Sequence, residues 1–276
     1  MKSLVVAFAA MLGTVAVASY TAASADRHRK PQEVLVVASD FAFQTDDTIR
    51  SGLTTFKLVN HGVEPHLMQV VRLEQGRSLS DMVEHMAAGR HLPSWARYVG
   101  GPSVPPAADS SRITVDLEPG EYALLCFISS HDKVSHVAKG MVKSLTVVPA
   151  ERVIQTAPEA DVRMILDDYS FQLMEPIRAG RRVIRVENVA RQPHEVAIVR
   201  VQQPISEQDL QLWLAGKKGP PPHEPVGGAL ALSQGEVNYV TADFVPGHYV
   251  LICYVPDAGD GLPHTRHGMI RQLEIR

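Results

Sequence analysis

The feature of this 276-residue sequence that most limits its fold is a pattern that occurs twice. The stretch LLCFISSHDKVSHVAKGMVKSLTV covers residues 124–147, and LICYVPDAGDGLPHTRHGMIRQLEI covers residues 251–275. In each, an alternating apolar run ends on Cys, and a loop, a His, a Gly-Met pair and a second alternating run follow. A chain with such internal similarity is expected to contain two domains of one fold.

The match extends over nearly the whole chain at an offset of 127 or 128 positions. We therefore predict one domain over residues 26–150 and a second over residues 151–276, with a linker near residues 148–158. The matched pairs include Asp40 and Asp168, Asn60 and Asn188, Pro65-His66 and Pro193-His194, Gly100-Gly101 and Gly227-Gly228, Cys126 and Cys253, His136 and His264, and Gly140-Met141 and Gly268-Met269.

The first 25 residues have the pattern of a secretory signal peptide. Lys2 precedes an apolar run over residues 4–17, and Ala23-Ser24-Ala25 is a small-residue cleavage pattern. This run is shorter than the roughly 20 residues that a membrane span needs. We expect a periplasmic or secreted protein with no transmembrane segment in the mature chain. The formal net charge of −3 provides no basic field for nucleic acid.

The remaining sequence favours an all-β fold. Apolar residues alternate with polar ones in short runs, and 19 Pro and 19 Gly provide turns between them. The predicted strands of the first half cover residues 34–38, 54–60, 67–72, 112–117, 121–126 and 141–148. We predict tandem Greek-key β-sandwiches, each with one inserted short helix.

The predicted helix of the first half covers residues 78–89, with Ser78 as its N-cap and Gly89 as its stop. Its apolar stripe consists of Leu79, Met82, Val83 and Met86. In the second half, Ser206 is the cap, Leu210, Trp213 and Leu214 form the stripe, and Gly216 ends the helix. The stripes are most simply packing residues, although Met82 and Met86 could also form a surface that passes copper.

Each half offers the side chains of a blue-copper site in the same order. A thiolate, two imidazoles and a thioether are the ligands that such a site uses. The first half offers His66, Cys126, His136 and Met141, and the second offers His194, Cys253, His264 and Met269. Taken singly, each of these side chains could instead be an ordinary core residue. Because the two cysteines hold equivalent positions in separate domains, we do not expect a disulfide between them.

The arrangement resembles the cupredoxins, the family of plastocyanin and azurin. The segment TFKLVN…EPH, residues 55–66, is similar to the segment of plastocyanin that carries its first ligand. PGEYALLC, residues 119–126, is similar to the strand that leads to the ligand Cys, and HVAKGM and HTRHGM both give the spacing His-x4-Met. The resemblance implies a type 1-like site for one or two copper ions. It implies equatorial imidazoles at His66, His136, His194 and His264, thiolates at Cys126 and Cys253, and axial thioethers at Met141 and Met269.

The spacing after each Cys departs from that family. Nine residues separate Cys126 from His136 and ten separate Cys253 from His264, whereas blue-copper loops are usually shorter. His131 is an alternative ligand in the first half, at the spacing Cys-x4-His of azurin, but the second half has Ala258 at the matching position. A longer loop loses more conformational entropy when it is ordered over a metal.

Other histidines have no matched pattern, and we expect surface or supporting positions for them. They are His61, His85, His91, His131, His223, His248 and His267. If cleavage follows Ala25, the mature chain begins Asp26-Arg27-His28, and a free amine with His at position three can bind Cu(II) or Ni(II) in a square plane.

The sequence predicts an exported copper protein that transfers single electrons or handles copper. We expect it to exchange electrons with a redox partner protein through an exposed imidazole edge. The alternative is a metal-free binding or scaffold module in the cell envelope. We do not expect an enzyme, because copper enzymes of this fold place His beside the ligand Cys, and no His-x-His occurs in the chain. Zinc could also occupy the same ligands.

Overall fold

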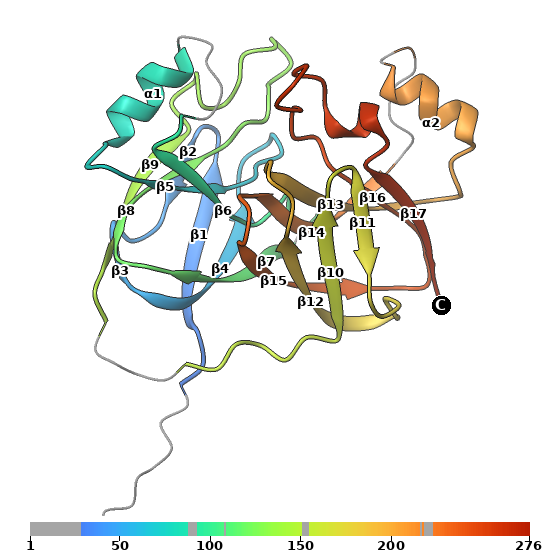
Figure 1. Ribbon diagram of the computed structural model, residues 1–276, viewed down its shortest axis with the longest axis horizontal. Coiled ribbons are helices and arrows are strands. Elements are labelled where there is room, and N and C mark those ends of the chain that lie inside the picture. The colour runs from blue at the N-terminus through green and yellow to red at the C-terminus, as the bar shows by residue number, and fades with distance from the viewer. Residues whose placement is uncertain (1–28, 88–92, 108, 151–154, 216, 218–222) are drawn as a thin grey trace, which may run out of the picture.

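The structure is a computed structural model that describes residues 29–87, 93–107, 109–150, 155–215, 217 and 223–276. Nearly all of its regular structure is β (Figure 1). The elements of the first half are β1 (Gln32–Ser39), β2 (Ala42–Gln44), β3 (Thr48–Arg50), β4 (Gly52–Asn60), β5 (Gln69–Leu73), α1 (Leu79–Ala87), β6 (Ala96–Gly100), β7 (Ser110–Leu117), β8 (Gly120–Leu125) and β9 (Val142–Val148).

The second half has the same order of elements, except that it lacks a counterpart of β3 among the described residues and adds a short 3-10 helix. They are β10 (Val162–Asp167), β11 (Ser170–Leu173), β12 (Gly180–Asn188), β13 (His194–Val201), α2 (Glu207–Leu214), β14 (His223–Leu232), β15 (Val237–Phe244), β16 (Gly247–Ile252), the 3-10 helix η1 (His264–His267) and β17 (Ile270–Ile275).

Strand pairing is also the same in the two halves. In the first, β4 pairs in parallel with β1 and antiparallel with β7, and β5 lies between β6 and β8. In the second, β12 pairs in parallel with β10 and antiparallel with β15, and β13 lies between β14 and β16. The predicted fold class, two tandem β-sandwiches with one short helix in each, is confirmed. Figure 1 shows α1 and α2 at the same edge of the molecule.

Both sheets continue from one half into the other. Strands β7 and β15 pair antiparallel over four positions, from Asn238 opposite Val115 to Thr241 opposite Arg112. Strands β6 and β14 meet at Leu232 and Val99. The result is one eight-stranded and one nine-stranded sheet, each of which contains strands from both halves. The two sandwiches are therefore joined by backbone hydrogen bonds as well as by side chains.

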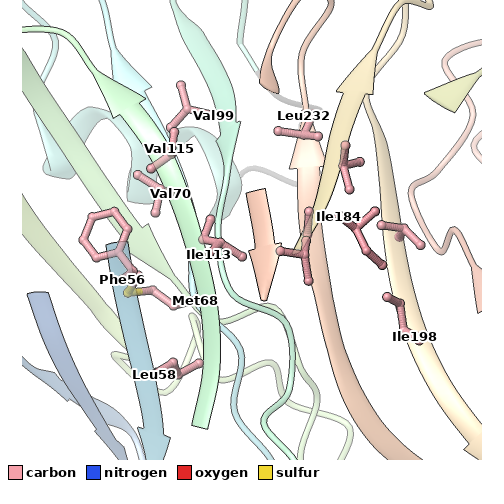
Figure 2. Packing of buried hydrophobic residues seen from close by; sticks show 14 of the residues in the cluster. Phe56, Leu58, Met68, Val70, Val99, Ile113, Val115, Ile184, Ile198 and Leu232 are labelled. Carbon is pink, nitrogen blue, oxygen red and sulfur yellow. The ribbon is translucent and has the colours of Figure 1, made fainter. Parts of the chain in front are cut away.

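The core lies between these sheets and also runs through the junction. Alternate residues of the strands point inward, so Phe56, Leu58 and Ile113 are fully buried in the first half and Ile184 in the second. Figure 2 shows these side chains in two groups, with Phe56, Leu58 and Ile113 on one side and Ile184 on the other. Val99 and Leu232, which pair across the junction, belong to the same buried cluster. One buried apolar cluster contains residues of both halves.

Two repeated glycine pairs let neighbouring segments within each half approach closely. A Cβ atom on Gly101 would lie 2.0 Å from the carbonyl oxygen of Met68, and one on Gly228 would lie 2.0 Å from that of Val196. Both glycines have positive φ angles, 142° and 135°. Glycine is therefore needed at Gly101 and Gly228 for two reasons: a side chain would collide with the neighbouring backbone, and other residues rarely adopt these φ angles.

The helices are as predicted where the structure describes them. The Oγ atom of Ser78 accepts a hydrogen bond from the backbone N–H of Asp81 at 3.2 Å, and that of Ser206 accepts one from Asp209 at 3.1 Å. Leu79, Met82 and Met86 pack into a cluster beneath α1, and Leu210 and Trp213 into one beneath α2, which supports the packing interpretation. Gly89 and Gly216 lie outside the described residues, as do residues 1–28.

The principal strands were predicted within a few residues, whereas β2, β3 and β6 were not predicted. Strands β2 and β3 are three residues long, and such runs are too short to show a period. Within the described ranges, no helix is long and apolar enough to cross a membrane.

Asn238 provides a test of the junction. Its fully buried side chain donates to the carbonyl of Val99 at 3.0 Å and accepts from the N–H of Gly101 at 3.3 Å. We predict that Asn238→Ala lowers the free energy of unfolding by about 1–3 kcal/mol, because it leaves buried backbone groups unpaired. Urea denaturation measures this change, with the exposed Gln203→Ala as the control. Equal stabilities for the two variants would contradict this role.

Candidate metal centres

The candidate ligands of each half come from the ends of strands at one edge of its sandwich. In the first half, His66 lies before β5, Cys126 follows β8 and Met141 precedes β9. His136 lies in the loop between β8 and β9. In the second half, His194 begins β13, Cys253 follows β16, His264 begins η1 and Met269 precedes β17. Strand pairing fixes the upstream His and the Cys, because β5 pairs with β8 and β13 pairs with β16.

The first group is compact and buried. The Nδ1 atoms of His66 and His136 lie 3.1 Å apart, and the Sγ atom of Cys126 lies 3.4 Å from Nδ1 of His136. The ligand atoms of all three residues lie within 4.8 Å of one another. None of the three residues is exposed to solvent. This is the donor set of a thiolate copper site, drawn from segments up to 70 residues apart in the chain.

The second group repeats this geometry. The Sγ atom of Cys253 lies 3.4 Å from Nδ1 of His264 and 3.9 Å from Nδ1 of His194. All three residues are fully buried, and their ligand atoms again lie within 4.8 Å of one another. Both cysteines are free thiols, each in its own group.

The long loops after each Cys fold back so that His and Met return to the Cys. The N–H of Cys126 donates to the carbonyl of Met141 at 3.3 Å, and the N–H of Met141 donates to that of His136 at 2.8 Å. In the second half, the N–H of Cys253 donates to Met269 at 3.3 Å and that of Met269 to His264 at 3.0 Å. Backbone hydrogen bonds thus bring Cys and His residues that are ten or eleven positions apart into one place. Both Met side chains are fully buried, and their role as axial ligands stays a prediction.

The alternative ligand His131 lies away from this group. Its side chain is exposed, whereas His136 is fully buried and contacts Cys126. The structure therefore brings together the ligand set that the two halves share.

Backbone N–H groups also surround each sulfur. Leu67 and Ile128 donate toward Cys126, and Glu195 and Val255 toward Cys253. Burial nevertheless raises the pKa of both thiols. A thiolate would thus need a cation beside it, and the N–H groups would add stabilisation of its charge.

The outer nitrogen of each imidazole is hydrogen-bonded to an oxygen. Nε2 of His66 lies 2.8 Å from Asp40, and Nε2 of His136 lies 3.0 Å from Glu64. Hydrogen bonds to backbone N–H groups, with His66 adding to them, hold the pKa of Asp40 below its usual range. The hydrogen bond from His136 does the same for Glu64. Both carboxylates are therefore ionised and can only accept hydrogen bonds.

This hydrogen bonding fixes the tautomer of each imidazole. With its proton on Nε2, each ring points the lone pair of Nδ1 toward the cysteine sulfur. Burial lowers the pKa of His66, His194 and His264, the last to about 4, so these rings favour the neutral form that binds metals. In the first group two Nδ1 atoms face each other at 3.1 Å, and a bound cation would satisfy both lone pairs.

The second centre differs from the first in one of these partners. Nε2 of His194 lies 3.0 Å from Asp168, which is the counterpart of Asp40. Nε2 of His264 lies 3.2 Å from the amide oxygen of Gln192, where the first half has Glu64. Asp257 lies farther from this nitrogen, at 3.7 Å, and accepts a hydrogen bond from the hydroxyl of Tyr169.

These supporting residues were not predicted from the sequence. The signal was present, since Asp40 and Asp168 are a matched pair and Glu64 lies two residues before His66. The alternation of apolar residues gives no information about loops, so the contact of these oxygens with the imidazoles could only be seen in three dimensions. Gly62 shows how close the packing is, because a Cβ atom there would lie 2.3 Å from Asp40 and 2.6 Å from His66.

The expectation that an imidazole edge is exposed was wrong. All four imidazoles have no exposed surface, because their outer nitrogens are covered by the carboxylate and amide groups. The exposed side chains nearest to the sulfurs in the sequence are the residues that follow each Cys, Phe127 at 37% and Tyr254 at 46% exposure.

The geometry of both centres is cupredoxin-like. No protein-family model matches the sequence. A search of curated proteins found no match either. Among solved structures, auracyanin from Roseiflexus castenholzii matches with 20% identity over 44% of this chain and 100% of its own, at a TM-score of 0.32. A multicopper oxidase matches with 14% identity over 91% of this chain and 94% of its own, at a TM-score of 0.27.

A copper nitrite reductase from Nitrosomonas europaea matches with 14% identity over 90% of this chain and 94% of its own, at a TM-score of 0.26. These superpositions are loose, so no residue role is transferred from them. The resemblance to cupredoxins rests on the β-sandwiches and the two His-Cys-His groups. The prediction that the chain is not an enzyme was wrong, because the matched proteins that span both of its halves include copper enzymes.

The carboxylate beyond His66 provides a test of the first centre. We predict that Asp40→Asn, in a Cys253→Ser chain that keeps only this centre, weakens Cu(II) binding by about 10- to 100-fold, because the imidazole loses its charged anchor. Competition with a chelator of known affinity measures the change. The exposed Asp46→Asn is the control, and equal affinities for the two variants would show that Asp40 does not support the ligand.

Proposed function

We propose that this protein binds copper at the His66–Cys126–His136 and His194–Cys253–His264 centres and uses them for one-electron transfer. The observation that carries the proposal is the convergence of a cysteine sulfur and two imidazole nitrogens within 4.8 Å of one another, twice, in fully buried positions. A scaffold module would have no need for six buried donor atoms that point toward one another. When bound, copper supplies a couple between its +1 and +2 states.

The donor set fits copper better than the other common metals. A soft thiolate with imidazoles suits Cu(I) and Cu(II), and the buried Met141 and Met269, whose backbones are hydrogen-bonded to the Cys and His residues, would add a thioether. Zinc accepts the same Cys and His donors, so the metal in the cell has to be measured.

The protein contributes a rigid ligand frame. Paired strands hold His66 and Cys126, hydrogen bonds from His136 to Glu64 and from Met141 to His136 hold the loop, and the second half does the same. Ligands that do not move when the charge of the metal changes favour fast electron transfer. Loss of the thiol proton accompanies metal binding, because the buried thiols otherwise favour their neutral form.

Phe127 and Tyr254 are the proposed route by which electrons reach the surface. Each is bonded directly to a ligand Cys and is more exposed than any ligand. We infer that a redox partner contacts the protein near these residues. The signal-peptide pattern of residues 1–25 supports a periplasmic or secreted protein, and the equivalent strand pairings of the two halves support an internal duplication.

An absorption spectrum tests the proposal. We predict that the protein with one and then two equivalents of Cu(II) shows an intense visible thiolate-to-copper band, which ascorbate removes and an oxidant restores. Cys126→Ser and Cys253→Ser should each remove part of the band, because each deletes one thiolate. Ser103→Ala, at another buried position, is the control. Folded protein that binds Cu(II) without any such band would contradict the proposal.

A further inference from the structure

A cavity lies where the two halves meet, beside both candidate centres. Its volume is about 500 Å³, which is within the range of small-molecule sites. Leu67, Phe127 and Ile128 line it from the first half, and Leu230, Val255 and Pro256 from the second. Four of its lining residues directly follow a proposed ligand in the sequence: Leu67, Phe127, Glu195 and Tyr254.

Glu195 carries the one carboxylate that lines this mostly apolar cavity. One of its oxygens accepts a hydrogen bond from the N–H of Tyr254 at 2.9 Å. No Lys, Arg or His among the described residues forms an ion pair with it, although other carboxylates of the protein have such partners.

Three aromatic residues line the same cavity. They are Tyr98, Phe127 and Tyr254. The backbone N–H of Tyr254 contacts Glu195 directly, and Tyr98 lines the same cavity as the carboxylate. Aromatic rings around one carboxylate are a common way to bind organic ammonium ions, because ring faces attract cations and the apolar lining accepts their carbon groups. Hard metal cations such as Ca²⁺ and Mg²⁺ take about six or more oxygen ligands, usually with several carboxylates, whereas this cavity offers one carboxylate.

We propose that the cavity between the two halves binds a small organic ammonium ion, with Glu195 as its ion-pair partner and Tyr98, Phe127 and Tyr254 around it. The site goes beyond the proposed electron transfer and does not depend on bound copper. A ligand there would lie against the residues that follow both Cys126 and Cys253, so one molecule would contact the surroundings of both centres.

Calorimetric titration of the full chain at pH 8 without added copper tests this inference. The probe is choline, and its uncharged analogue 3,3-dimethylbutan-1-ol has the same shape. We expect saturable binding of one choline per chain and much weaker binding of the alcohol. Glu195→Gln should weaken choline binding by about 10-fold or more, because the ion pair is lost. The exposed Glu33→Gln should leave it unchanged.

Tyr254→Leu provides a second variant at a more exposed position, and we expect it to weaken choline binding by removing a ring face. Thermal unfolding establishes that each variant is folded. The inference is overturned if the folded parent does not bind choline, if the alcohol binds as tightly, or if Glu195→Gln binds choline like the parent. A failure of copper binding would not affect these titrations, so the two proposals fail separately.

Discussion

The candidate centres depend on hydrogen bonds that lie outside them. Asp40, Glu64, Asp168 and Gln192 each accept from the outer nitrogen of one imidazole, and this fixes the nitrogen that faces the sulfur. Without these acceptors a ring could turn or carry its proton on Nδ1, and the lone pair would no longer point inward. The supporting oxygens are as important for the geometry as the ligands themselves.

These hydrogen bonds act within a frame that the two halves share. Because β7 pairs with β15 and β6 meets β14, each sheet contains strands of both halves. The buried side chain of Asn238 strengthens the same junction. A shared frame limits relative motion of the centres and creates the cavity between them, so the junction determines both the distance between the centres and the proposed ammonium site.

The sequence predicted the parts of this structure that depend on periodicity and repetition. Alternation located β4, β7, β8 and β9, and the repeated order of His, Cys, His and Met located the residues of both groups. The comparison of the two halves favoured His136 over His131, but the backbone hydrogen bonds that return the loop to Cys126 were not visible in the sequence. The expectation of an exposed imidazole edge was wrong, because contacts with Asp40 and Glu64 cover the imidazoles of the first centre. The pairing between the halves was not predicted, because the alternation of apolar residues within a strand does not show which strand lies next to it.

The measurement that tests the account most directly is X-ray absorption at the copper edge, on the protein loaded with one copper ion per centre. The account predicts a first shell of two imidazole nitrogens and one short bond to sulfur for each copper, in the oxidised and in the reduced protein alike. A shell made only of nitrogen and oxygen atoms would show that copper binds elsewhere, and that the convergence of Cys126 and Cys253 with their histidines does not form the copper sites.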